Sequence, residues 1–276
     1  MFEVLPNEAL ALIGDYMCYV DIMAWRFSCS HVYYNLAPPN ITKLVKKELN
    51  KHISREDEFL ELLNTKKAIL AGSLMVKVLY DAEWEPGDID VFEHPEQEES
   101  KTFHECLPSL GMSQISGPGW RYSSNKERYK HTINYISPLP GKISPMKRIY
   151  ETFDNDIVKI AFFAGKLYVK DWNKLIARKS YCVPSYLMWI GCYGERTFRH
   201  NDVLLKQKIK DATLAEMHSR LEKYRGRGFT LTIHRQNLSL IQKGLQHSYS
   251  LNQREQDFER LFNLLDFNKH MDEELD

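Results

Sequence analysis

The fold is decided by two stretches, Ala68-Ile-Leu-Ala-Gly-Ser73 and Gly87-Asp-Ile-Asp-Val-Phe92. An apolar run that ends in Gly-Ser indicates a strand that turns directly into a helix. The second stretch predicts another strand, on which alternate residues share one face. Asp88 and Asp90 therefore project together, while Ile89 turns into the sheet.

The chemistry of these residues points to a bound phosphate and a metal ion. Two neighbouring carboxylates repel each other unless a cation lies between them, and Mg²⁺ prefers carboxylate and phosphate oxygens. Gly72 lets the backbone come close to a phosphate, and Ser73 begins a helix expected over residues 74–81, whose first N–H groups attract anions. The pattern predicts a site for a nucleoside triphosphate with Mg²⁺ or Mn²⁺. The alternative is an ordinary strand-to-helix turn beside two solvated aspartates.

The order and spacing of the two stretches resemble the nucleotidyltransferase superfamily, which includes DNA polymerase beta, poly(A) polymerases and tRNA-adding enzymes. The resemblance covers about residues 65–180 and implies an α+β fold, a mixed sheet with flanking helices. It also implies that Asp88 and Asp90 are the catalytic metal ligands, with Gly72 and Ser73 binding the nucleotide.

Further stretches are similar to uncharacterised nucleotidyltransferase-like proteins of fungi and large DNA viruses, some of which also carry F-boxes. They are Ile133 through Phe153-Asp154, Gly165-Lys-Leu-Tyr168, and Lys223-Tyr224 followed by Gly228-Phe229.

Two-metal nucleotidyl transfer usually takes a third carboxylate from a neighbouring strand, often as the base. The strand expected at 131–136 carries Asn134 instead, whose amide oxygen binds a cation weakly and cannot take a proton. Asp154 and Asp156 either supply the missing acid or brace the loop between a helix and a strand, and we favour bracing. Asn134 and Asp154 remain candidate metal ligands. Whether the protein is an enzyme, transferring a nucleotidyl group to a nucleic-acid or protein hydroxyl, or a degenerate relative stays open.

Residues 1–37 predict three short helices, ended by Pro38-Pro39. They resemble an F-box, the module that docks substrate receptors on the adaptor of SCF ubiquitin ligases. The resemblance is carried by Leu5-Pro-x-Glu8, Tyr16-Met17, Asp21-Ile22 as the start of the second helix, Phe27-Ser-Cys29 and Tyr33-Tyr34. It implies an SCF adaptor as partner and a substrate receptor as the alternative function. The other interpretation is a helical cap on the main domain.

Composition is typical of a soluble globular protein: 276 residues, 43% apolar and 27% charged, with a formal net charge of zero. No apolar run is long enough for a membrane span, and the N-terminus lacks a secretory signal pattern. Five scattered cysteines predict neither a disulfide framework nor a zinc knuckle. We expect a reduced protein of the cytoplasm or nucleus.

Charge is unevenly distributed along the chain. Residues 81–105 hold ten acids and one base, whereas residues 196–227 hold nine bases and four acids. An acidic edge and a basic C-terminal part would suit a metal-bound polyphosphate or a nucleic acid. Lys206, Lys223 and Arg227 are therefore expected to neutralise phosphates, unless they only solvate helix faces.

Three domains are predicted. Residues 1–40 form the F-box-like module, and residues 41–180 form the nucleotidyltransferase-like domain, with helices at 41–50, 55–63 and 101–110 and a hairpin over 157–169. Residues 181–276 are mostly helical, with one strand at 229–233.

Overall fold

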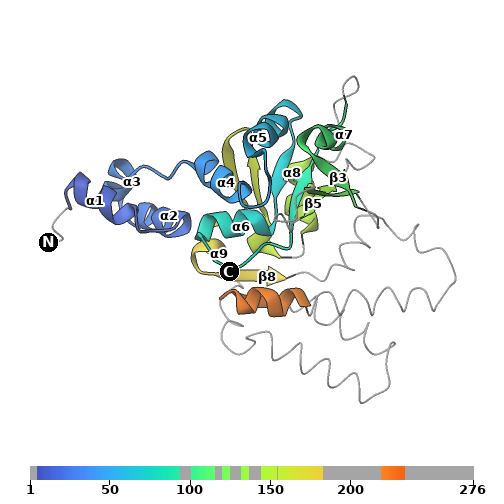
Figure 1. Ribbon diagram of the computed structural model, residues 1–276. Coiled ribbons are helices and arrows are strands. Elements are labelled where there is room, and N and C mark those ends of the chain that lie inside the picture. The colour runs from blue at the N-terminus through green and yellow to red at the C-terminus, as the bar shows by residue number, and fades with distance from the viewer. Residues whose placement is uncertain are drawn as a thin grey trace, which may run out of the picture. The chain divides into compact units, whose positions relative to one another are not determined.

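The computed structural model describes residues 5–93, 101–115, 120–124, 132–136, 144–153, 155–182 and 219–233 (Figure 1). The chain forms two compact units. The first comprises Met1–Glu151 and Val158–Trp172, and the second comprises Thr152–Ile157 and Asn173–Asp276.

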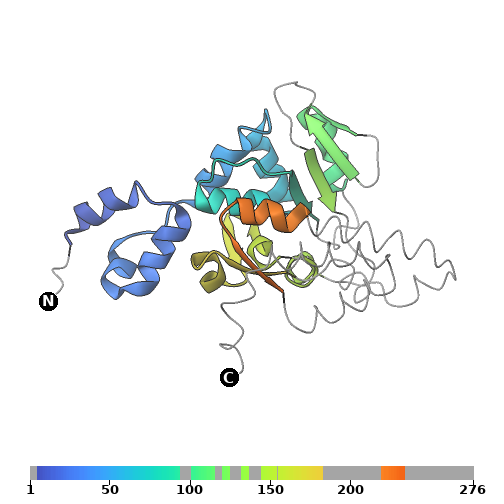
Figure 2. The same cartoon turned by 90° about the horizontal axis from the view of Figure 1, so that it is seen from below.

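The first unit begins with three helices that share a small apolar core. They are α1 (Asn7–Gly14), α2 (Tyr19–Ser28) and α3 (Ser30–Asn35) (Figure 2). Leu10, Ile22, Val32 and Leu36 are buried together in this core. The second helix starts earlier than predicted, after Cys18, so Asp21 is in its first turn and does not cap it. A carboxylate there favours the helix dipole. The rings of Tyr19 and Phe27 lie 6.1 and 6.0 Å from that of Trp172, which attaches the three helices to the rest of the unit.

Two amphipathic helices follow, α4 (Ile41–Leu49) and α5 (Glu56–Thr65). The Asn40 side chain caps α4 by accepting a hydrogen bond from the Lys43 backbone N–H at 3.0 Å. Ile41, Val45 and Leu49, spaced four residues apart, form its buried face. Both helices lie close to their predicted positions.

A seven-stranded mixed sheet forms the centre of the first unit, in the order β3-β4-β5-β2-β1-β6-β7. Its neighbours are antiparallel except for β2 and β5. The strands are β1 (Ile69–Ala71), β2 (Asp88–Phe92), β3 (Met112–Gln114), β4 (Trp120–Ser124), β5 (Thr132–Ile136), β6 (Ile160–Phe163) and β7 (Lys166–Val169). The predicted α+β class, with a mixed sheet and flanking helices, is confirmed.

Helix α6 (Ser73–Tyr80) lies at the core of this unit, against β1, β2 and β6. All of its residues from Ser73 to Leu79 are buried, since α2 and α4 also contact it. Strands β3 and β4 were not predicted from the sequence. Strand β3 has three residues, of which Ser113 and Gln114 are exposed, and pairing with β4 holds it.

The helix predicted over 101–110 divides into α7 (Phe103–Cys106) and the 3₁₀ helix η1 (Leu107–Leu110), since Pro108 supplies no N–H. Buried Glu93, just after β2, accepts hydrogen bonds from the Phe103 N–H at 2.7 Å and from the Tyr135 hydroxyl. Burial and the Glu93 contact raise the pKa of Tyr135. This carboxylate joins the end of β2 to the start of α7.

The remaining elements include α8 (Pro145–Thr152) and the 3₁₀ helix η2 (Asp156–Val158). The first strand of the predicted hairpin was expected from residue 157 and begins only at Ile160. Then follow α9 (Trp172–Ile176), β8 (Lys179–Cys182) and, after helical residues 219–226, β9 (Thr230–Ile233). The strand β9 was predicted and its parallel partner β8 was not. In the described ranges, no helix is both long and apolar enough to cross a bilayer.

Candidate functional site

The turn between β1 and α6 is built on a single glycine. Gly72 has φ +82° and ψ −153°, a combination that is essentially restricted to glycine. Ala71 pairs with Asp90 across the two antiparallel strands. A Cβ atom at Gly72 would stand 2.4 Å from Asp90 Oδ2, so the carboxylate lies directly against the turn. Both the backbone conformation and this contact require glycine here.

The two aspartates share the accessible face of β2. Ile89 and Val91 are completely buried, whereas Asp88 and Asp90 are only half-buried. The alternation follows the period of the strand. The face that carries the two carboxylates also meets the turn where α6 begins, and buried Ser73 is the first residue of that helix.

Strand β5 adds a neutral side chain beside Asp90. It runs parallel to β2, and its register places Asn134 opposite Asp90 and Thr132 opposite Asp88. Asn134 Nδ2 donates a hydrogen bond to Asp90 Oδ1 at 2.8 Å. An ionised carboxylate only accepts hydrogen bonds, so the amide turns its nitrogen toward it. Asn134 is thus a hydrogen-bond donor to Asp90 at the position where a third carboxylate was expected from the sequence.

The other predicted site residues lie elsewhere in the chain. Lys223 and Arg227 belong to the second unit, where both cations stand over the Tyr224 ring, at 5.1 and 5.2 Å from its centre. Burial lowers the pKa of Arg227. Lys206 and Asp154 fall outside the described residues.

Asp156, the second acid of the pair before the hairpin, forms an ion pair. Its carboxylate lies 2.8 Å from Lys174 Nζ within the second unit. This contact links η2 to α9, as expected of a residue that braces a loop. The geometry therefore agrees with the bracing interpretation of Asp156.

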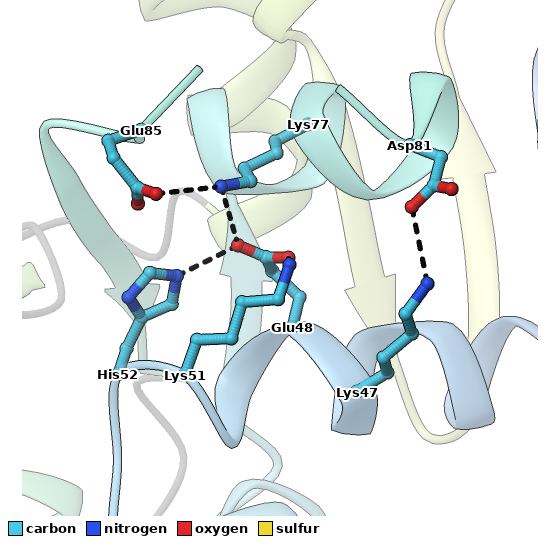
Figure 3. Close-up of polar contacts among 7 residues, drawn as sticks. All are labelled: Lys47, Glu48, Lys51, His52, Lys77, Asp81 and Glu85. Carbon is cyan, nitrogen blue, oxygen red and sulfur yellow. Dashed lines mark hydrogen bonds and ion pairs between the residues drawn. The ribbon is translucent and has the colours of Figure 1, made fainter. Parts of the chain in front are cut away.

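A buried polar cluster that the sequence did not predict connects α4, α6 and the segment before β2. At its centre is Glu48 of α4, which is only 6% exposed. Three nitrogen atoms contact its carboxylate: His52 Nε2 at 2.9 Å, Lys77 Nζ at 3.1 Å and Lys51 Nζ at 2.7 Å (Figure 3). Lys77 of α6 also reaches Glu85, ahead of β2, at 3.4 Å. We call Glu48, Lys51, His52, Lys77 and Glu85 the Glu48 cluster.

Three members of the Glu48 cluster have metal-ligating groups. The ligand atoms of Glu48, His52 and Glu85 lie within 4.8 Å of one another. However, the ammonium of Lys77 contacts the carboxylates of both Glu48 and Glu85. The lysine therefore occupies the place that a metal ion would take. The cluster is therefore a structural link between α4, α6 and the segment that leads into β2. Glu48 and His52 are four residues apart in the sequence, but only the fold brings in Lys77 and Glu85.

The comparisons with known proteins yield two solved structures and no family. No protein-family model matches the sequence, and no curated protein matches it. One similar structure is a CCA-adding enzyme in complex with CTP, at TM-score 0.41 and 11% identity, over 82% of this chain and 55% of that one. The other is a CCA-adding enzyme in apo form I, at TM-score 0.40 and 13% identity, over 82% and 54%. The chain spans about half the length of both.

Proposed function

We propose that the face formed by Gly72, Ser73, Asp88 and Asp90 binds a nucleoside triphosphate through Mg²⁺ or Mn²⁺. The observation that supports this proposal is the placement of the Asp90 carboxylate directly against the Gly72 turn. Carboxylates that hold a cation would thereby stand beside the N–H groups at the start of α6, which favour phosphate. The cation would neutralise the repulsion between Asp88 and Asp90.

The second part of the proposal is nucleotidyl transfer to a hydroxyl of a nucleic acid or a protein, as in the nucleotidyltransferase superfamily. Asp88, Asp90 and the Gly72-Ser73 turn are suited to bind a cation and a phosphate. The site lacks an obvious general base, because Asn134 cannot accept a proton. Lys206, Lys223 and Arg227 are proposed to neutralise phosphates, and Asp154 remains proposed as a further metal ligand. Asn134 donates its amide hydrogen to Asp90, so we propose it as a hydrogen-bond donor at the site and no longer as a metal ligand. Incorporation of labelled nucleotide into RNA or protein tests transfer separately from binding.

A thermal-shift titration tests nucleotide binding. With Mg²⁺ and a nucleoside triphosphate at about 100 times its dissociation constant, the free energy of unfolding should rise by roughly 2.7 kcal/mol. Asp90→Asn should remove this response, because the variant loses a charge from the cation site. Its stability without ligand should change by less than about 1 kcal/mol, since the new amide oxygen still accepts from Asn134.

Glu83→Gln is the matched control, because it removes an exposed charge from the segment before β2. It should keep the full nucleotide response. A flat titration of the wild type with every nucleotide and with both metals would remove the proposed function. An Asp90→Asn protein that is clearly destabilised yet responds normally would show that Asp90 braces the fold and holds no cation.

A second candidate function is that of an adaptor, in which residues 1–37 dock on the adaptor subunit of an SCF ubiquitin ligase. It is favoured by the exposed apolar surface of α1 to α3. Among the described residues, all exposed large apolar side chains except Tyr168 lie in this part of the chain: Leu5, Leu12, Ile13, Tyr16, Phe27, Tyr33 and Tyr34. Such a concentration is typical of a protein–protein interface.

A pull-down of the full chain with the purified SCF adaptor subunit tests this candidate. The variants Leu12→Asp and Tyr16→Ala should abolish capture, because these side chains are 61% and 87% exposed and their loss leaves the small core intact. Tyr168→Ala, an exposed aromatic outside the three helices, should be captured like the wild type. Failure of the intact chain to bind would exclude this partner.

A further inference from the structure

We propose that Asn134 limits the candidate site to a single divalent cation. This inference rests on the proposed binding of a metal-bound nucleotide by Asp88 and Asp90. It concerns the number of cations that these side chains hold, which decides whether a two-metal transfer mechanism is open to the protein.

Asn134 donates a hydrogen bond to the Asp90 carboxylate. In a two-metal site the ions lie about 3.5–4 Å apart, and a carboxylate between them offers one oxygen to each. Asp90 Oδ1 instead accepts from Asn134 Nδ2 at 2.8 Å. The donated amide hydrogen carries partial positive charge and points at this oxygen. A second cation beside Oδ1 would meet this hydrogen in place of a ligand.

The other oxygen of the Asp90 carboxylate, Oδ2, faces away from Asn134. Asp90 Oδ2 lies against Gly72, at the end of the sheet face where α6 begins. A cation held there by Asp90 and Asp88 leaves the Asn134 hydrogen bond intact. A second cation would require Asn134 to turn its amide over, and that costs the hydrogen bond to a charged acceptor.

The strand on the other side of β5, β4, brings a positive charge to the same face of the sheet. Arg121 of β4 is opposite Asn134 in the antiparallel register of β4 and β5. Residues directly opposite each other project from the same face. The row across the three strands is therefore Asp90, Asn134 and Arg121, which runs from a carboxylate through an amide to a guanidinium. Positive charge beyond Asn134 further disfavours a second cation on this side.

A count of bound Mn²⁺ tests the inference. The full chain is titrated with Mn²⁺ in the presence of a non-hydrolysable nucleoside triphosphate analogue, and bound ions are counted by electron paramagnetic resonance. The wild type should hold one Mn²⁺ per bound nucleotide. Asn134→Asp has nearly the same shape, but it replaces the donor by a carboxylate. This variant should hold two Mn²⁺, with the spin coupling expected of neighbouring ions.

The outcomes separate this inference from the proposed function. Two Mn²⁺ ions on the wild type, or one on a folded Asn134→Asp variant, would overturn the inference and leave nucleotide binding in place. No Mn²⁺ on the wild type would remove the proposed function and the inference with it. If Asn134→Asp does not fold, Asn134→Ala removes the donor without adding charge. It should gain a second, weaker Mn²⁺, and a count that stays at one would again overturn the inference.

Discussion

Replacing Glu48 by alanine is expected to lower the free energy of unfolding by about 3–5 kcal/mol, because it leaves a buried ammonium without its main partner. Lys77 is 2% exposed and contacts two carboxylates, of which Glu48 is buried and Glu85 lies toward solvent. Glu48 also accepts from buried His52. Denaturant unfolding followed by circular dichroism measures the loss.

Two controls separate the buried charge from other effects. Glu61→Gln removes an exposed carboxylate from α5 and should change stability by less than about 0.5 kcal/mol. The double variant Glu48→Met, Lys77→Met removes both partners and should recover much of the loss, since apolar side chains can replace a buried ion pair at little cost. If the double variant loses as much stability as the single variants Glu48→Met and Lys77→Met lose in sum, the two residues do not interact as the structure shows.

The same carboxylate predicts a loss of stability in acid. Burial alone would raise the pKa of Glu48, but hydrogen bonds from His52, Lys51 and Lys77 outweigh it and lower the pKa to about 2. Because the pKa is lower in the folded state than its ordinary value of 4.5, the ionised carboxylate stabilises the folded protein at pH values above 4.5. This contribution, roughly 3 kcal/mol, disappears as the pH falls from 4.5 to 2. The wild type should therefore lose more stability over this range than Glu48→Ala.

Gly72→Ala is expected to cost about 3–5 kcal/mol and to abolish the response to Mg²⁺ and nucleotide. The backbone conformation of Gly72 costs about 1–3 kcal/mol for any other residue. The new methyl group would also stand 2.4 Å from Asp90 Oδ2 and displace the carboxylate from Asn134. Loss of a hydrogen bond to a charged group adds about 1.5–3 kcal/mol.

Two other glycines serve as controls. Gly111 is in the ordinary left-handed region (φ +74°, ψ +32°), and a Cβ added there would meet no atom within 4 Å, so Gly111→Ala should show the cost of that conformation alone, about 1–2 kcal/mol. Gly87, just before Asp88, has open space and no positive φ. Gly87→Ala should change stability by less than about 1 kcal/mol. If Gly72→Ala costs no more than Gly111→Ala, the Asp90 carboxylate is not held against the turn.

The strand-to-helix turn at Gly72-Ser73 and the shared face of Asp88 and Asp90 were predictable because both are local. Alternation along a strand depends only on backbone geometry, and glycine before a helix marks a conformation closed to other residues. The helices over residues 41–49 and 56–65 were predictable for the same reason. The two short strands β3 and β4 were not, since pairing with β5 defines them more than their own residues do.

The sequence by itself therefore determined the α+β class, the turn and the two aspartates that share one face. Only the tertiary structure decided what surrounds them. It placed the Asn134 amide on Asp90 Oδ1, the Gly72 turn on Oδ2, and Lys77 between Glu48 and Glu85. These contacts join residues 8 to 44 positions apart in the sequence. Strand register and helix packing bring such residues together, and local pattern does not encode either.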